Sequence, residues 1–292
     1  MEIRKVCIVG AGTLGSRIAM QCALSGYRVH VYDVDTKALD RSINLMQKLL
    51  GQLIKLKVAL PENPEVALAS IQFLPHLAEA IADADLVSES VTENLAVKKR
   101  VWEELGEVAP SKTLFTTNTS FLLPSQLASS SGRPSLFCAL HFHDVFHARL
   151  VDIMPHPKTD RSVIPVLEVF GRSLNQVPVV VRKEYPGYLF NTMLMSCIHA
   201  AGKLLTRGVA EVEDIDRSWM VNFHMGIGPF GILDQIGLDT AWHVTNNNPD
   251  KYTQAFADLL GRYIEQGKLG EKSGEGFYTY PRPRYKDKDF LY

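Results

Sequence analysis

Two residues that could move a proton stand close together in this sequence, each in a short apolar segment. His141 lies near the end of the run Ser135-Leu-Phe-Cys-Ala-Leu-His-Phe-His143, which is typical of a buried strand, and Asp152 follows in the next apolar segment. A free histidine has a pKa of about 6.5, so it exchanges protons at neutral pH. The imidazolium that forms needs an anion beside it, and Asp152 is the nearest candidate on a neighbouring strand. The pair predicts a general base, His141, with Asp152 as its partner, although a lone histidine at a strand end can also be structural.

A glycine-rich turn near the start of the chain predicts a dinucleotide site. The motif follows a predicted strand over Lys5–Val9 and opens a helix. Gly10 permits the tight turn, Gly12 lets the backbone approach a pyrophosphate, and Gly15 lets helix and strand pack closely. The pyrophosphate is expected at the helix N-terminus, where unpaired N–H groups favour anions. The predicted cofactor contacts in this motif are Gly10, Gly12, Thr13, Leu14 and Gly15.

An acidic residue at the end of the next predicted strand indicates which dinucleotide binds. Asp33 stands 18 residues after Gly15, where a carboxylate hydrogen-bonds a ribose 2′-hydroxyl and repels a 2′-phosphate. No arginine adjoins Asp33 to receive such a phosphate. The sequence therefore predicts NAD rather than NADP. A strand-end histidine combined with a nicotinamide site predicts a dehydrogenase in which His141 moves the proton.

Strands and helices alternate through the first part of the chain. Several predicted strands are continuous apolar runs, as expected for strands covered on both faces. This alternation predicts an α/β fold with a Rossmann-type, doubly wound and mostly parallel sheet. The predicted strands are Lys5–Val9, Arg28–Tyr32, Leu86–Ser90, Thr113–Thr117, Leu136–Phe142, Leu150–Met154 and Val177–Arg182. The predicted helices between them are Leu14–Leu24, Thr36–Val58, Leu95–Val108 and Ser162–Leu174.

The pattern changes after Tyr185-Pro-Gly187. From there to about Leu260 no convincing strand appears, and the apolar residues of Asn191–Leu205 follow one stripe of an α-helix. We therefore predict two domains, an NAD-binding domain over residues 1–184 and an all-α domain over residues 185–292 for substrate binding and dimerisation. The charged run that begins at Pro281 is expected to be a solvated tail.

Composition narrows the class of protein. The formal net charge is −1, which gives no reason to expect nucleic acid or an anionic membrane as a partner. The sequence contains neither a signal-peptide pattern nor an apolar run long enough to span a bilayer. The four cysteines are scattered without a CxxC pair, which favours buried free thiols in a reducing compartment. We expect a cytoplasmic protein whose partner is a small-molecule substrate.

A cluster of imidazoles around His141 raises the alternative of a metal site. His143, Asp144 and His147 follow His141 closely, and imidazoles with a carboxylate suit zinc or non-haem iron. These residues are crowded onto one strand and turn, and a nicotinamide enzyme of this type needs no metal. We therefore expect none.

Seven ordered blocks, which together span nearly the whole chain, resemble the 3-hydroxyacyl-CoA dehydrogenase family. The blocks are Gly10-Ala-Gly-Thr-Leu-Gly15, Val91-Thr-Glu-Asn94, Thr117-Asn-Thr-Ser120, His141-Phe142, Pro186-Gly-Tyr-Leu-Phe-Asn191, Gly228-Pro-Phe-Gly-Ile-Leu-Asp-Gln-Ile-Gly-Leu-Asp239 and Gly270-Glu-Lys-Ser-Gly-Glu-Gly-Phe-Tyr278. The resemblance implies NAD as cofactor and a helical C-terminal domain that builds a homodimer. It also implies that His141 is the catalytic base, that Asp152 takes the place of its acidic partner, and that Ser120 and Asn191 lie around the reacting oxygen.

The resemblance further implies cofactor contacts outside the glycine motif. Two of these residues, Ser120 and Asp144, also lie near the expected reacting centre. The residues that match the family's cofactor-contacting positions are Glu93, Lys98, Asn118, Ser120, Asp144 and Lys272.

Two departures from the family pattern lie beside the predicted base. The family usually has His-Phe-Phe-Asn-Pro where this chain has His-Phe-His-Asp-Val, so Asp144 stands where an asparagine normally contacts the cofactor. The acidic partner is usually glutamate, and Asp152 is one methylene shorter. The backbone must therefore approach His141 more closely for the same contact.

A third departure concerns CoA. The serine and lysine with which the family contacts CoA align near Leu49 and Leu56, although Lys55 and Lys57 are close by. Some relatives act on free acids or on small keto and diketo esters, and Leu122-Leu-Pro-Ser-Gln-Leu127 resembles that branch. For such substrates His143, His147 and Arg149 could meet a carboxylate, since arginine presents a bidentate fork; in solvent, Arg149 would instead be an ordinary edge-strand charge.

The function predicted from the sequence is the NAD-dependent interconversion of a 3-hydroxyacyl-CoA and a 3-ketoacyl-CoA of short chain length. The first alternative keeps this chemistry on a free 3-hydroxy acid or a diketo ester. The second is a catalytically silent NAD-binding protein, because a fold does not determine a function.

Overall fold

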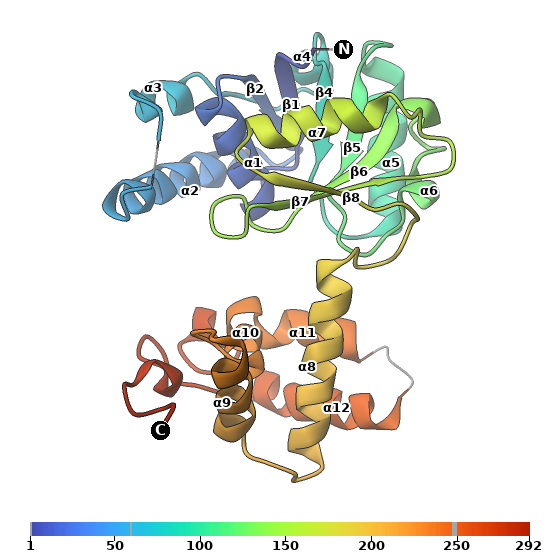
Figure 1. Cartoon of the computed structure of the whole chain (residues 1–292). Coiled ribbons are helices and arrows are strands. Elements are labelled where there is room, and N and C mark those ends of the chain that lie inside the picture. The colour runs from blue at the N-terminus through green and yellow to red at the C-terminus, as the bar shows by residue number, and fades with distance from the viewer. Residues whose placement is uncertain (1, 59, 247–249) are drawn as a thin grey trace. The chain divides into compact units, whose positions relative to one another are not determined.

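The computed structural model describes residues 2–58, 60–246 and 250–292. They form two compact units, which divide between Leu189 and Phe190 (Figure 1). The boundary predicted between residues 184 and 185 lies shortly before this point. Each unit has its own buried apolar core, and each is described here by itself.

The first unit is built on one eight-stranded sheet with the order β3-β2-β1-β4-β5-β6-β7-β8. All neighbouring strands are parallel except β6 and β7, which confirms the predicted mostly parallel, doubly wound sheet. The strand β3 was not predicted. The strands are β1 (Lys5–Val9), β2 (Arg28–Tyr32), β3 (Gln72–Leu74), β4 (Leu86–Glu89), β5 (Leu114–Thr117), β6 (Phe137–Phe142), β7 (Leu150–Pro155) and β8 (Val177–Val180).

Helices cover both faces of this sheet (Figure 1), because alternate residues of the strands are apolar on opposite faces. In β1, Val6 and Ile8 join the core that contains α1, α2 and α7, whereas Cys7 and Val9 join the core under α4, α5 and α6. The helices of this unit are α1 (Thr13–Leu24), α2 (Thr36–Lys55), α3 (Pro64–Ala69), α4 (Leu77–Ile81), α5 (Leu95–Val108), α6 (Pro124–Leu127) and α7 (Val163–Ser173).

The order of the strands reverses direction beside β1. The chain runs from β1 outward to β2 and β3 and then returns to β4 on the other side of β1, where Val9 at the end of β1 pairs with Tyr32 on one side and Glu89 on the other. Ligands of open α/β sheets bind outside the carboxyl ends of the strands at such a reversal. The topology therefore predicts a ligand site at the loops that follow β1, β2 and β4.

The second unit is helical, as predicted. Apart from isolated bridges around Gly270 and Glu275, its described residues contain no strand. Its core includes Ile198, Phe230 and Phe256, all fully buried. The helices are α8 (Phe190–Thr206), α9 (Val212–Phe223), α10 (Pro229–Ile236), α11 (Leu238–Thr245) and α12 (Lys251–Glu265).

The expected solvated tail at the C-terminus is wrong. Tyr285 and Phe290 are buried in the core of the second unit, and the guanidinium of Arg217 lies over the Phe290 ring at 4.9 Å. Half of the residues of this segment are charged, which is why it was expected to be solvated. Its two buried aromatic side chains nevertheless hold it against the core of the second unit, because burying each ring removes a large apolar surface from water.

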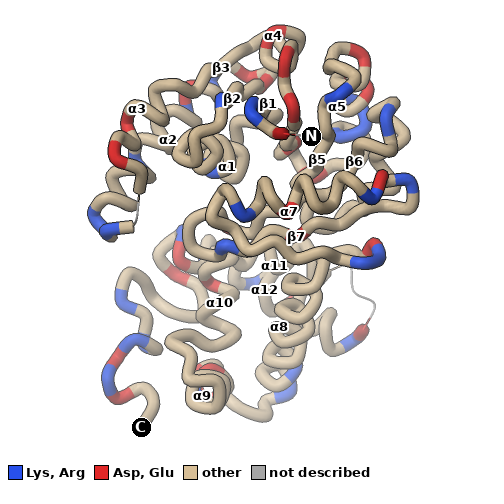
Figure 2. Tube along the Cα trace, turned by 45° about the horizontal axis from the view of Figure 1, so that its top comes forward, with Lys and Arg blue, Asp and Glu red and all other residues tan. Residues whose placement is uncertain are grey.

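None of the described helices combines the length and the apolar character needed to cross a membrane. Figure 2 shows lysine and arginine as well as aspartate and glutamate on both units. This distribution agrees with the net charge of −1.

Candidate functional site

The turn between β1 and α1 is built as the glycine motif predicts. Gly10 has a φ of +107°, and a Cβ there would lie 2.7 Å from the carbonyl oxygen of Ser90. A Cβ on Gly15 would lie 2.0 Å from the carbonyl oxygen of Gly10, so neither position can accept a side chain. A Cβ on Gly12 would instead meet open space. The N-terminus of α1 therefore stands clear of other groups, as an approaching pyrophosphate requires.

A cavity of about 690 Å³ opens beside this turn. Asp33 lies in its lining, where its carboxylate accepts the backbone N–H of Ala11 at 2.8 Å and that of Asp35 at 3.0 Å. The cavity lies at the reversal of strand order and is lined by Gly10, Gly12 and the Asp33 carboxylate. Backbone N–H groups for a pyrophosphate and a carboxylate for a ribose are the donor and acceptor set that NAD requires. The residues present thus fit the predicted cofactor.

Two arginines in this cavity were missed in the sequence. Arg41 and Arg100 both line it, and Arg41 reaches it from α2 while donating to the carboxylate of Asp35 at 2.9 Å. The statement that no arginine adjoins Asp33 was made along the chain; in the structure Arg41 and Arg100 share the lining of the cavity with Asp33. The signal was available, because Asp35 caps α2 and Arg41 follows it by 6 residues on that helix.

His141 and Asp152 face each other across the antiparallel strands β6 and β7. They are direct partners in the register of the two strands, so their side chains project side by side from the same face. The Nδ1 of His141 lies 3.3 Å from the Oδ2 of Asp152, and both side chains are buried. This cross-strand position brings the shorter aspartate within reach of the imidazole.

The second nitrogen and one face of the His141 ring are also in contact with other residues. Its Nε2 lies 3.2 Å from the Oγ of Ser120, and the ring of Tyr188 stacks on it with 4.6 Å between centroids and 7° between planes. The Tyr188 hydroxyl donates to the carbonyl of Thr119 at 2.8 Å. The imidazole is therefore held by its two nitrogens and by one face. No role for Tyr188 was predicted, although it belongs to the block that begins at Pro186.

Asp152 contacts a second imidazole. The Nε2 of His143 lies 2.7 Å from the same Oδ2 that faces His141. Burial by itself raises the pKa of Asp152, but the hydrogen bonds from His141 and His143 outweigh burial and lower that pKa below its ordinary value. Burial lowers the pKa of His141, and the hydrogen bond to Asp152 only partly opposes this. The geometry therefore combines an ionised acid with a neutral imidazole, a combination suited to accepting a proton.

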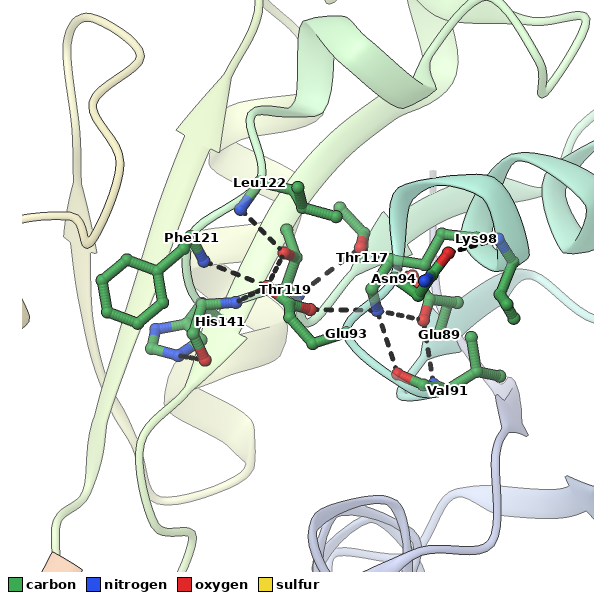
Figure 3. Close-up of polar contacts among 12 residues, drawn as sticks. Glu89, Val91, Glu93, Asn94, Lys98, Thr117, Thr119, Phe121, Leu122 and His141 are labelled. Atoms are coloured by element: carbon green, nitrogen blue, oxygen red, sulfur yellow. Dashed lines mark hydrogen bonds and ion pairs between the residues drawn. The ribbon is translucent and has the colours of Figure 1, made fainter. Parts of the chain in front are cut away.

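Glu93 organises the loop that carries Ser120 (Figure 3). Its carboxylate accepts the Thr119 hydroxyl and the backbone N–H groups of Ser120 and Phe121, the latter two at 3.0 and 3.1 Å. Burial would raise the pKa of Glu93, but these hydrogen bonds and the charge of Lys98 lower it. Glu93, predicted as a cofactor contact, thus shapes the loop beside His141.

Lys98, also predicted as a cofactor contact, is fully buried under this loop. Its ammonium donates to Glu89 at 2.6 Å and to the carbonyl of Val91 at 3.1 Å, and it lies 3.5 Å from Glu93 (Figure 3). In this structure Lys98 holds the segments after β4 together.

Asn118 and Asp144 hold the end of β6 in place. The Oδ1 of Asn118 accepts the backbone N–H of Phe142 at 2.7 Å. Asp144 forms an ion pair with Arg17 on α1 and accepts the N–H groups of Phe146 at 2.9 Å and of the following residue at 3.0 Å. Asp144, which also belonged to the metal alternative, is therefore engaged by one guanidinium and two backbone groups.

Two predicted site residues belong to the second unit. Asn191 lies at the start of α8, and Lys272 forms an ion pair with both carboxylate oxygens of Asp239 at 2.6 Å. The other predicted catalytic and cofactor residues all lie in the first unit. Gly10, Gly12, Thr13 and Asp33 line the cavity, and Ser120 and Asp152 contact His141. The roles of Asn191 and Lys272 stay predictions.

The chain is similar to known proteins over almost its whole length. A family model described as 3-hydroxyacyl-CoA dehydrogenase, NAD binding domain, matches residues 5–185, and the C-terminal domain of the same family matches residues 187–280. A probable 3-hydroxybutyryl-CoA dehydrogenase of Deinococcus radiodurans is 33% identical over 94% of this chain and all of its own. The mitochondrial hydroxyacyl-coenzyme A dehydrogenase of Sus scrofa is 32% identical over 95% of this chain and 91% of its own.

A solved structure shares the fold of both units. It is a diketoreductase described by its dual catalysis of dicarbonyl compounds, with a TM-score of 0.91 and 38% identity over 96% of this chain and all of its own. The matched models cover most of the sequence, and the site contains the glycine turn, the Asp33 carboxylate beside it and the pair of His141 and Asp152. The chain belongs to the 3-hydroxyacyl-CoA dehydrogenase family of NAD-dependent oxidoreductases.

Proposed function

We propose that this enzyme interconverts a 3-hydroxyacyl-CoA and a 3-ketoacyl-CoA of short chain length, with His141 as the general base. The observation that carries the proposal is the line of contacts from Ser120 Oγ to His141 Nε2 and from His141 Nδ1 to Asp152 Oδ2. Bound NAD supplies the acceptor for the hydride that leaves the hydroxyl-bearing carbon.

The hydrogen bonds around His141 determine which nitrogen takes the proton. An ionised carboxylate only accepts hydrogen bonds, so the Nδ1 of His141 carries a proton and donates to Asp152. The lone pair of the neutral ring is then on Nε2, which faces Ser120. His141 accepts the hydroxyl proton of the substrate at Nε2, and the charge of Asp152 stabilises the imidazolium that results.

Ser120 positions the substrate oxygen in this mechanism. Its hydroxyl can donate a hydrogen bond to that oxygen while the oxygen transfers its own proton to His141. Asn191 has the same role by the family resemblance, since its side-chain amide is a donor. Asp152 does not give up its charge, which is consistent with its lowered pKa.

The test is the turnover of CoA esters, the free 3-hydroxy acid and a diketo ester by the purified enzyme with NAD or NADH. We expect 3-hydroxybutyryl-CoA to be oxidised at least about ten times faster than the free acid, because binding of the CoA portion can supply energy that the free acid lacks. His141→Ala should lose activity by about 10²–10⁴-fold and bind NADH as the unaltered enzyme does. Substantial activity of His141→Ala would refute the assignment of the base.

A second candidate keeps this chemistry and replaces CoA by a free 3-hydroxy acid or a diketo ester. It is supported by the 38% identity to a diketoreductase. It is also supported by the positions aligned with the family's CoA contacts, because Leu49 is buried in the core and Leu56 is an exposed apolar residue at the end of α2. The polar residues nearby, Lys55 and Lys57, are exposed.

The same assay separates the candidates. Faster turnover of a diketo ester than of acetoacetyl-CoA selects the second candidate. A catalytically silent NAD-binding protein would change NADH absorbance with none of these compounds.

Three further expectations accompany the proposed function. The helical unit serves substrate binding and dimerisation, which is supported by exposed apolar side chains at the end of α9, Val221 and Phe223, and at Met225 beyond it. Light scattering of Phe223→Asp should show monomers where the unaltered protein shows dimers. A cytoplasmic location is supported by the four cysteines, which are all free.

A further inference from the structure

A single carboxylate oxygen serves two histidines at the candidate catalytic centre. The Oδ2 of Asp152 lies 3.3 Å from the Nδ1 of His141 and 2.7 Å from the Nε2 of His143. The Oδ1 is buried and has no hydrogen-bond partner among the described residues. An ionised carboxylate can only accept hydrogen bonds, so each histidine donates an N–H hydrogen bond to it. One negative charge is thus divided between two imidazoles.

The division is unequal and favours His143. The contact of His143 with Asp152 is shorter than that of His141 by 0.6 Å, the difference between 3.3 and 2.7 Å. The two rings lie edge to face with 4.6 Å between their centroids. A positive charge on either ring therefore acts on the other at short range and in buried surroundings, where screening by water is weak.

We propose that His143 is a positioning residue that competes with His141 for Asp152 and thereby lowers the proton affinity of the catalytic base. This inference rests on the proposed role of His141. Its function is to keep His141 neutral, and hence able to accept a proton, at a lower pH than Asp152 alone would permit. The enzyme is thereby adapted to oxidation of the hydroxyl substrate.

The other groups around His141 do not supply this effect. Glu93 is a second acid that acts on His141, and its charge raises the pKa of His141. Its carboxylate is engaged by the loop around Thr119 and by Lys98. Tyr188, which stacks on the ring, stays neutral because burial raises its pKa well above the ordinary value. Among these neighbours, His143 is the one whose charge opposes protonation of His141.

The consequence is a defined change in the pH profile when His143 is replaced. In His143→Phe, Asp152 serves His141 alone, so protonation of His141 becomes more favourable. The acid limb of kcat/KM for hydroxyl oxidation reports the proton affinity of the free base. We expect this limb to move to higher pH by about one unit, since a charge at such a distance shifts a pKa by roughly that amount or more.

A second substitution separates hydrogen bonding from charge. His143→Gln keeps an N–H donor for Asp152 but cannot become positive, so we expect its limb to lie between those of the unaltered enzyme and His143→Phe. The control is His76→Gln, which removes an exposed imidazole at the start of α4, where its side chain makes no capping hydrogen bond. We expect its profile to be unchanged.

Nuclear magnetic resonance of the histidine rings supplies a readout that does not depend on turnover. The imidazole signals of His141 should titrate at higher pH in His143→Phe than in the unaltered protein, by the same amount as the kinetic limb. If both His143 variants leave the limb and the His141 signals where they were, the inference is overturned. That result differs from failure of the proposed function, which would appear as activity retained by His141→Ala.

Discussion

The rings of His141 and Tyr188 are parallel and 4.6 Å apart, and Tyr188 adopts a left-handed backbone conformation to place its ring there. Its φ is +54°, which is uncommon for a bulky side chain and is retained only where surrounding contacts stabilise it. The hydroxyl is anchored on the carbonyl of Thr119, next to Ser120. One residue thus fixes both the plane of the base and the loop that faces its reactive nitrogen.

Replacing Tyr188 should lower kcat without lowering the affinity for NADH. In Tyr188→Leu the ring of His141 loses its stacking partner, and we expect kcat to fall by about a hundredfold, the effect of a displacement of about 1 Å in a reacting group. Tyr188→Phe keeps the ring and loses the hydroxyl, so its loss should be about tenfold or less, the value of one hydrogen bond. Equal losses in the two variants, or a loss of NADH affinity alone, would contradict the role of the stack.

The ion pair between Arg17 and Asp144 should favour cofactor binding, because Arg17 compensates the negative charge of Asp144. Arg17 lies one helical turn after Thr13, which lines the cofactor cavity. In Arg17→Gln the charge of Asp144 is no longer compensated, and we expect NADH to bind about five- to tenfold more weakly because its pyrophosphate is negative. Adding Asp144→Asn removes that charge and should restore most of the affinity. Calorimetric titration with NADH measures both; additive losses in the double variant would exclude charge compensation.

The preference for NAD over NADP should depend on Asp33. When Asp33 is replaced, Arg41 should allow the enzyme to use NADPH. Asp33→Ser removes a charged acceptor and should weaken NADH binding about tenfold or more. It also removes the repulsion of a 2′-phosphate, and Arg41 in the same cavity can then bind that phosphate. We expect a measurable gain in the use of NADPH. The gain should disappear in Asp33→Ser/Arg41→Gln, and a gain that persists there would assign the phosphate to another group, such as Arg100.

The buried pair of Lys98 and Glu89 should be the most costly of these contacts to break. Both side chains are at most 1% exposed and lie 2.6 Å apart. Lys98→Met leaves the Glu89 carboxylate buried with hydrogen bonds from Thr117 and the backbone but without a cation, and we expect a loss of about 3–5 kcal/mol in the free energy of unfolding. Lys99→Met, the neighbouring lysine, serves as the control in denaturant unfolding, where we expect a change of at most about 0.5 kcal/mol.

The fold could be predicted from the sequence where strands are apolar on both faces. Segments such as Lys5–Val9 show this pattern, and the structure has β1 there. The strand β3 was missed because Gln72–Leu74 has only three residues and lies at the edge of the sheet, so it is too short for any period to show. The C-terminal segment was misjudged because its charges conceal Tyr285 and Phe290, which are buried.

Residue types and spacing were enough to predict the central pair of the candidate site but not its further contacts. His141 and Asp152 were found because they stand on consecutive apolar segments, and the structure makes them direct partners across two strands. The second contact of Asp152, with His143, depends on how far the chain continues past β6 before it turns. The stack of Tyr188 depends on a left-handed backbone that no spacing rule reveals.

The direct pairing of His141 with Asp152 across β6 and β7 also leaves the outer part of the connecting loop free of contacts with these two side chains. Backbone hydrogen bonds of the sheet keep the two residues adjacent, and in the loop itself His143 contacts Asp152 and Asp144 contacts Arg17. Residues 147–149, by contrast, are exposed. These three positions can therefore be exchanged while the contacts of His141, Asp152, His143 and Asp144 are retained, and a library of variants there is the corresponding route to new substrate preferences.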